Sequence, residues 1–164
     1  MKRIILLLIS LYLLILLQTG FFNFLKVSPN FILLAVLMII LFQRKITSFG
    51  LIAVVSGGFL LDAFSGFFFG ISILTLLLIY FLSFFLLKVL IRTSALEVLI
   101  LIVLGTFAYN LFIPFLKYLS DLILTANPMF NLNFSYFIIL EIILNLIFGI
   151  PVFYIIKKHK NLKH

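Results

Sequence analysis

The chain has 164 residues, of which 66% are hydrophobic and only 10% are charged, and its formal net charge is +8. A soluble domain is about half apolar and a quarter charged, so this chain lacks the polar residues to cover a water-exposed surface. The composition, with a mean hydropathy of +1.43, therefore excludes a soluble globular protein and predicts an integral membrane protein.

Six apolar segments follow one another along the chain, divided by charged residues. The first has the basic flank of a signal peptide, but its apolar run exceeds the usual length of about 7–15 residues and no small-residue cleavage site follows. We therefore interpret it as a retained span. A single transmembrane domain is predicted, with spans at residues 4–25, 29–42, 46–65, 67–87, 95–114 and 136–156 and a basic tail at 157–164.

The basic residues alternate between the two sides of these spans. Only Lys26 and Lys117 fall on one side, so the positive-inside rule places the other side in the cytoplasm, together with both termini. Short clusters beside apolar runs determine topology, and we do not expect them to bind nucleic acid. The predicted cytoplasmic residues are Lys2, Arg3, Arg44, Lys45, Lys88, Arg92, Lys157, Lys158, Lys160 and Lys163.

Two helix starts have local signals. Ser28 followed by Pro29 is typical of an N-cap and a first helical residue, which would start the second span. That span then has about 14 residues, or roughly 21 Å against a hydrocarbon core of about 30 Å, so it must be short, thin the bilayer or be shielded by its neighbours. Ser94 and Glu97 have capping-box spacing before the fifth span, which gives Glu97 a structural role.

The long segment at residues 117–135 is the one predicted outer loop. Its "LSDLIL" sequence could form a short interfacial helix that Pro128 would end. Gly66 and Gly70 have the GxxxG spacing of helix dimers, but they flank the turn between the third and fourth spans, so we assign them to the turn. The predicted fold is an all-α polytopic membrane protein, a single six-helix bundle with a short second span and one interfacial loop.

Polar side chains within the spans lie at a common depth. Such groups are costly in the membrane and normally face the bundle interior. At about 1.5 Å per residue, five of these polar side chains lie about 22 Å from the cytoplasmic side, in the outer half of the hydrocarbon core. Asn145 lies one helical turn from Glu141, on the same face. The predicted polar layer comprises Gln18, Asp62, Thr75, Asn110, Glu141 and Asn145.

Asp62 has two interpretations at this stage. It is either a hydrogen-bond hub that pins the third, fifth and sixth spans, or a site for a ligand, an ion or a proton. We favour the structural role and read Asp62 as the polar pin of the hairpin formed by the third and fourth spans. A hub should tolerate replacement of Asp62 by asparagine, whereas a proton or cation site should fail. An ion-conducting bundle is a weaker reading, because no polar group continues the path through the inner half.

The sequence carries no recognisable catalytic chemistry. It has no cysteine and only four acidic residues, which excludes disulfides and thiolate metal sites. No nucleophile motif, metal-ligand cluster or phosphate-binding glycine loop is present. We therefore expect neither enzymatic activity nor a cofactor or metal.

Two consecutive segments resemble the rod shape-determining protein MreD family. These are "SPNFILLAVLMIILFQRK" at residues 28–45 and "GFLLDAFSGFFFGISILTLLLIYFL" at residues 58–82. In that family a proline-led second span and a basic inner loop precede a glycine-rich signature with one aspartate. The matching residues are Pro29, Asn30, Gly58, Leu61, Asp62, Ser65, Gly66 and Gly70.

The resemblance implies a non-enzymatic scaffold in the bacterial inner membrane that maintains rod shape. Such proteins dock to the bitopic protein MreC. They link cytoplasmic MreB filaments to the peptidoglycan synthases, the RodA polymerase and its penicillin-binding partner. The family is also similar in architecture to the substrate-binding S components of energy-coupling-factor transporters, so a protein that binds a small, vitamin-like ligand is the alternative.

Overall fold

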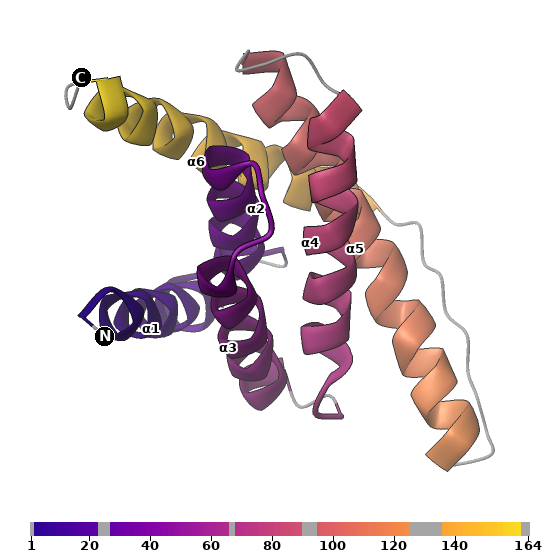
Figure 1. Ribbon diagram of the computed structural model, residues 1–164. Helices are drawn as coiled ribbons and strands as arrows, with labels where there is room; N and C mark the ends of the chain where they lie inside the picture. The colour runs from indigo at the N-terminus through magenta and orange to yellow at the C-terminus, as the bar shows by residue number, and fades with distance from the viewer. Residues whose placement is uncertain (1, 23–26, 66–67, 90–94, 125–135, 162–164) are drawn as a thin grey trace.

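The computed structural model of the chain describes residues 2–22, 27–65, 68–89, 95–124 and 136–161 (Figure 1). All regular structure within these residues is helical. Five segments, with α1 and η1 counted as one, are long and apolar enough to cross a membrane. The protein is a polytopic membrane protein with a helical bundle fold. Its elements are α1 (Lys2–Leu16), the π-helical η1 (Leu17–Phe21), α2 (Phe31–Gln43), α3 (Ser48–Ser65), α4 (Ile71–Val89), α5 (Ala95–Leu124) and α6 (Tyr136–Asn161).

The short helix α2 forms the centre of the bundle. Nine of its 13 residues are buried, and it contacts each of the five other α-helices. Figure 1 shows α2 with α1 and α6 on one side and α4 on the other. Because α2 is apolar around its whole circumference, it gains most by burial on every side. Of the three ways to accommodate a short second span, the structure shows shielding by neighbouring helices.

The start of α2 differs from the prediction. The N-cap is Asn30 rather than Ser28, and its side-chain oxygen accepts a hydrogen bond from the Leu33 amide at 3.0 Å. Pro29 therefore precedes the cap instead of occupying the first helical position. Asparagine is among the strongest N-cap residues, so it is preferred over a start two residues earlier.

Helix α5 also differs, because it runs for 30 residues and does not end at Pro114. Proline removes one backbone hydrogen bond, but the helical turns on both sides can continue when neighbouring groups satisfy the freed carbonyl. The predicted interfacial "LSDLIL" helix is the last part of α5, which projects beyond the other helices in Figure 1. Pro128, proposed as its end, lies outside the described residues.

Glycines allow α3 to pack closely against its neighbours. A Cβ atom at Gly58 would lie 2.6 Å from the Ile73 Cα of α4, and one at Gly57 would lie 2.7 Å from the Ile32 side chain of α2. Helices in membranes associate through such close contacts of small residues. The hairpin of α3 and α4 therefore depends on the absence of a side chain at Gly58.

We expect Gly58→Ala to destabilise the protein by about 1–3 kcal/mol, because the new methyl group would push the α4 backbone away. Gly20→Ala is the matched control, since a Cβ there would meet no atom within 4 Å. Thermal unfolding in detergent, followed by circular dichroism, would compare the two variants. Equal unfolding temperatures would contradict the tight α3–α4 contact.

Candidate functional site

Asn145 of α6 connects three helices inside the bundle. Its Oδ1 accepts a hydrogen bond from the Asn30 amide at 2.8 Å, and its Nδ2 donates to Thr106 Oγ1 at 2.9 Å. All three residues are buried. A polar group in lipid that lacks a partner costs several kcal/mol, so a closed set of bonds like this one ties α2, α5 and α6 together.

The first turn of α2 is satisfied by side chains from other parts of the chain. Gln18 in η1 accepts from the Phe31 amide at 3.2 Å, while Asn30 caps the Leu33 amide. The first four amide groups of a helix have no partner within the helix itself. The N-terminus of α2 is therefore held by its own N-cap residue Asn30, by Gln18 of η1 and by Asn145 of α6.

Asn110 and Glu141 extend the same network. Asn110 Nδ2 donates to Glu141 Oε2 at 2.8 Å and to the Thr106 carbonyl oxygen at 3.0 Å. Glu141 is partly exposed, whereas Thr106 is buried. We call the connected residues the polar cluster: Gln18, Asn30, Thr106, Asn110, Glu141 and Asn145.

Asp62 does not belong to the polar cluster through any hydrogen bond among the described residues. Its two carboxylate oxygens accept from the Gly70 amide at 2.7 Å and from the Ser72 amide at 2.9 Å. Both amides lie at the start of α4, where the helix dipole also favours a negative charge. The Asp62 side chain, which belongs to α3, therefore caps the N-terminus of α4. This agrees with the prediction that Asp62 is the polar pin of the hairpin formed by the third and fourth spans, whereas among the described residues neither oxygen bonds to the fifth or sixth span.

Two other residues of the segment that resembles the MreD signature, Gly70 and Ser65, lie at the same turn. Gly70 has a φ of +106°, a left-handed conformation that favours glycine. Ser65 Oγ lies 3.4 Å from the Asp62 carbonyl oxygen, to which it donates. Leu61 faces the core. Gly66 lies outside the described residues.

Thr75 also remains outside the polar cluster, since its hydroxyl donates to the Ile71 carbonyl oxygen of its own helix at 2.8 Å. Tyr109 of α5 lies between Asp62 and the polar cluster: its side chain is next to Asn30 and Ser72. Ser72 is itself buried. The predicted single layer is thus two bonded groups with Tyr109 between them.

An ion pair between a buried carboxylate and the half-buried Arg44 joins the C-terminal end of α2 to the first turn of α5. Both carboxylate oxygens of Glu97 contact Arg44 Nη2, at 2.8 and 2.6 Å, and the Glu97 side chain is 1% exposed. Arg44 is the left-handed C-cap of α2, with a φ of 52°, and its amide donates to the Ile40 carbonyl oxygen. The structural role expected of Glu97 is thus an ion pair. Its predicted capping partner, Ser94, lies outside the described residues.

Several residues of these sites carry roles that the sequence did not assign. Asn30 was known only as a signature residue, although its place before an apolar run is an N-cap signal. Arg44 and Glu97 were both predicted near the cytoplasmic side with opposite charges, so their pairing was open to inference. Tyr109 gave no signal, because one tyrosine in an apolar span is ordinary.

The chemistry of the site is that of helix association. Among the residues that the structure describes, no three His, Cys, Asp or Glu side chains come together to hold a metal ion. Several of the described polar side chains bond across helix boundaries, as those of Glu97, Glu141 and Asn145 do. Fold and site together define a polytopic membrane protein whose helices are joined by internal polar contacts.

Comparisons of the chain with family models, with curated proteins and with solved structures find no match.

Proposed function

We propose that this protein is a non-enzymatic scaffold of the bacterial cell membrane, of the kind that the MreD family provides in cell-wall elongation. The observation that carries the proposal is the use of the polar side chains: Asp62 caps α4, and Asn145 joins α2 to α5. These groups hold a fixed shape rather than line a reaction site. The signature that resembles the family thus has a structural role here.

In this proposal the scaffold docks to an MreC-type bitopic partner through an apolar helix face. Helix α1 offers a suitable face, because only 17% of the residues in its apolar membrane-spanning stretch are buried. Three exposed residues, Leu6, Ile9 and Leu13, follow one another at helical spacing. A single transmembrane helix from the partner would pack along this stripe, with MreB filaments, RodA and its penicillin-binding partner reached through the assembled complex.

The proposed orientation follows from the basic residues. Both termini would lie in the cytoplasm, where exposed residues such as Lys45 and Lys88 would face MreB filaments or anionic lipid headgroups. The proposed location is the bacterial inner membrane.

Depletion of the protein is expected to turn rod-shaped cells into spheres. Because the chain contains no cysteine, single cysteines can also locate the docking face. Ile9→Cys should form a disulfide with a cysteine in the partner's transmembrane helix, whereas Leu78→Cys, which is similarly exposed on α4, should not. Persistence of rods after depletion, with no paralogue present, would overturn the proposal.

The alternative is a small-ligand-binding component of a vitamin transporter. The side chains of Asn30, Ser72 and Tyr109 favour it, since these three polar groups lie next to one another inside the bundle. Most of the other polar groups are already bonded, which favours the scaffold. Thermal stabilisation of the purified protein by a vitamin-like molecule would favour the alternative.

A further inference from the structure

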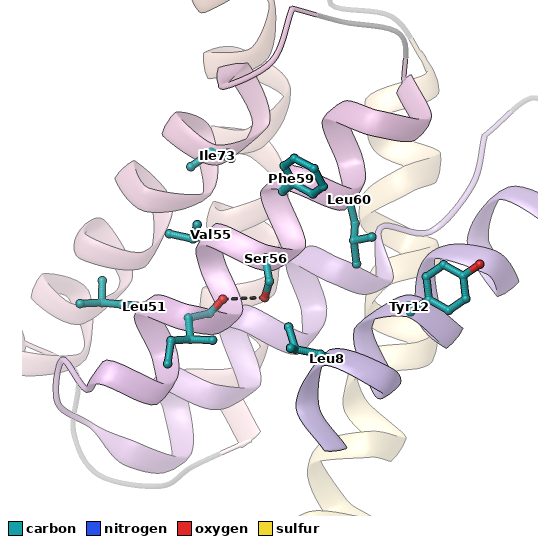
Figure 2. A pocket seen from close by; sticks show the side chains of 9 residues that line it. Leu8, Tyr12, Leu51, Val55, Ser56, Phe59, Leu60 and Ile73 are labelled. Carbon is teal, nitrogen blue, oxygen red and sulfur yellow. Dashed lines mark hydrogen bonds between the residues drawn. The ribbon is translucent and has the colours of Figure 1, made fainter. Parts of the chain in front are cut away.

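An apolar groove runs between α1 and α3 on the outside of the bundle. It has a volume of about 710 Å³ and is closed at one side by α4. Figure 2 shows side chains from all three helices around it. They include Leu8 and Tyr12 of α1, Val55, Ser56 and Phe59 of α3, and Ile73 of α4.

The lining offers little to a polar ligand, because the Tyr12 hydroxyl of α1 points away from the other lining side chains (Figure 2). Ser56 has the one hydroxyl that α3 contributes, and this hydroxyl donates to the Ile52 carbonyl oxygen at 2.6 Å (Figure 2). The remaining α3 residues named above are aliphatic or aromatic. An occupant must therefore be hydrocarbon over this length.

The glycines of α3 that allow close packing are used inside the bundle rather than in the groove. Transmembrane helices approach each other closely at small residues. Three small residues of α3 face inward: Gly57 lies against Ile32, Gly58 against Ile73, and Ala53 is fully buried. The groove presents larger side chains such as Val55 and Phe59, which leave an irregular hollow suited to a flexible chain rather than to a helix.

One end of the groove is flanked by positive charges. Helix α1 begins at Lys2 and Arg3, and Lys45 lies three residues before α3; all three are exposed. Basic residues therefore stand at or just before the N-terminal ends of both helices that line the groove. Basic residues near a membrane surface attract anionic lipids, by about 1 kcal/mol each.

The length of the groove matches one leaflet. From Leu51 to Leu60, both of which line it, α3 rises roughly 14 Å at about 1.5 Å per residue. Half of a hydrocarbon core of about 30 Å is about 15 Å. An acyl chain that enters from the basic end would fill the groove to the middle of the bilayer.

We infer that the groove between α1 and α3 holds an acyl chain of an anionic phospholipid, whose headgroup lies against Lys2, Arg3 and Lys45. The lipid would complete the surface of α3 that the protein leaves uncovered. This inference concerns the isolated protein in a membrane and does not depend on the proposed scaffold function.

The absence of tryptophan in the chain makes a fluorescence test possible. Val55→Trp places a reporter in the groove, and Phe81→Trp places one on the exposed surface of α4. By helix rise Val55 lies about 10 Å from the first residue of α3, and Phe81 lies about 12 Å from the last residue of α4. These two helix ends are on the same side of the α3–α4 hairpin. The full-length protein is reconstituted in mixed phosphatidylglycerol and phosphatidylethanolamine vesicles, in which one lipid or the other carries bromine on its acyl chains as a quencher.

Brominated phosphatidylglycerol should quench the Val55→Trp variant more strongly than brominated phosphatidylethanolamine does, while the Phe81→Trp variant should show no such preference. Adding Lys45→Gln to Val55→Trp should lower the apparent phosphatidylglycerol affinity at the groove about fivefold, which corresponds to about 1 kcal/mol. Lys88→Gln is the matched control, because Lys88 is an exposed lysine at the end of α4, and it should leave the quenching of the groove reporter unchanged.

Two results would overturn the inference. Equal quenching of the groove reporter by the two lipids would mean ordinary boundary lipid, and no quenching by either would mean that protein covers the groove. Phe59→Trp provides a second reporter if Val55→Trp does not fold, since Phe59 also lines the groove and is 53% exposed.

Discussion

Arg44→Ala is expected to lower the free energy of unfolding by about 3 kcal/mol, because it removes a charged partner from a buried carboxylate. Both oxygens of Glu97 contact Arg44 Nη2, and the Glu97 side chain is 1% exposed. The same pair joins the end of α2 to the first turn of α5. Its loss should therefore loosen the central helix as well as remove a favourable charge interaction. Thermal unfolding in detergent would measure the change.

Lys45→Ala is the matched control for this prediction. Lys45 follows Arg44 directly and is also basic, but its side chain is exposed, so we expect a change within about 0.5 kcal/mol. Adding Glu97→Gln to Arg44→Ala should restore part of the lost stability, because it removes the buried charge. Additive losses in the double variant would show that the two side chains do not act as a pair.

Asp62→Asn is expected to destabilise the protein by about 2–3 kcal/mol, although it preserves the size of the side chain. Each carboxylate oxygen accepts a backbone N–H, from Gly70 at 2.7 Å and from Ser72 at 2.9 Å. An amide has one acceptor oxygen, so its NH₂ group would face one of these donors. The structure thus reverses the earlier expectation that a hub at Asp62 tolerates asparagine.

Asp121→Asn makes the same chemical change at the other aspartate of the chain, which is only partly buried in α5. Its loss of stability should stay below about 1 kcal/mol, as is usual for carboxylates that remain in contact with solvent. Comparable unfolding temperatures for Asp62→Asn and the unsubstituted protein would show that Asp62 does not cap α4.

The helical character of the chain followed from its apolar runs, and each of the six predicted segments contains one helix among the described residues. The boundaries were harder to predict. Pro114 and the charges after it suggested the end of a helix, yet α5 continues to Leu124. Local breaker signals do not reveal whether tertiary neighbours satisfy the group that a proline frees.

The polar layer was predicted by depth, and depth placed Gln18, Asn110 and Glu141 in one bonded cluster with Asn145. The same argument failed for Asp62 and Thr75. Helix rise gives the height of a residue but not the direction of its side chain relative to helices that are distant in sequence. Asp62 faces the α3–α4 turn, eight residues along the chain from Gly70, which agrees with its interpretation as the polar pin of that hairpin but not with a place in the polar cluster.

The length of α2 has a consequence for how the protein is made. A helix of 13 residues rises about 20 Å, which is too little to cross a hydrocarbon core of about 30 Å as an independent segment. During synthesis α2 emerges before α3, α4, α5 and α6, the four helices that complete its enclosure. Stable integration of α2 must therefore follow the membrane insertion of the later segments. If synthesis stops early, the released chain lacks the helices that would enclose α2.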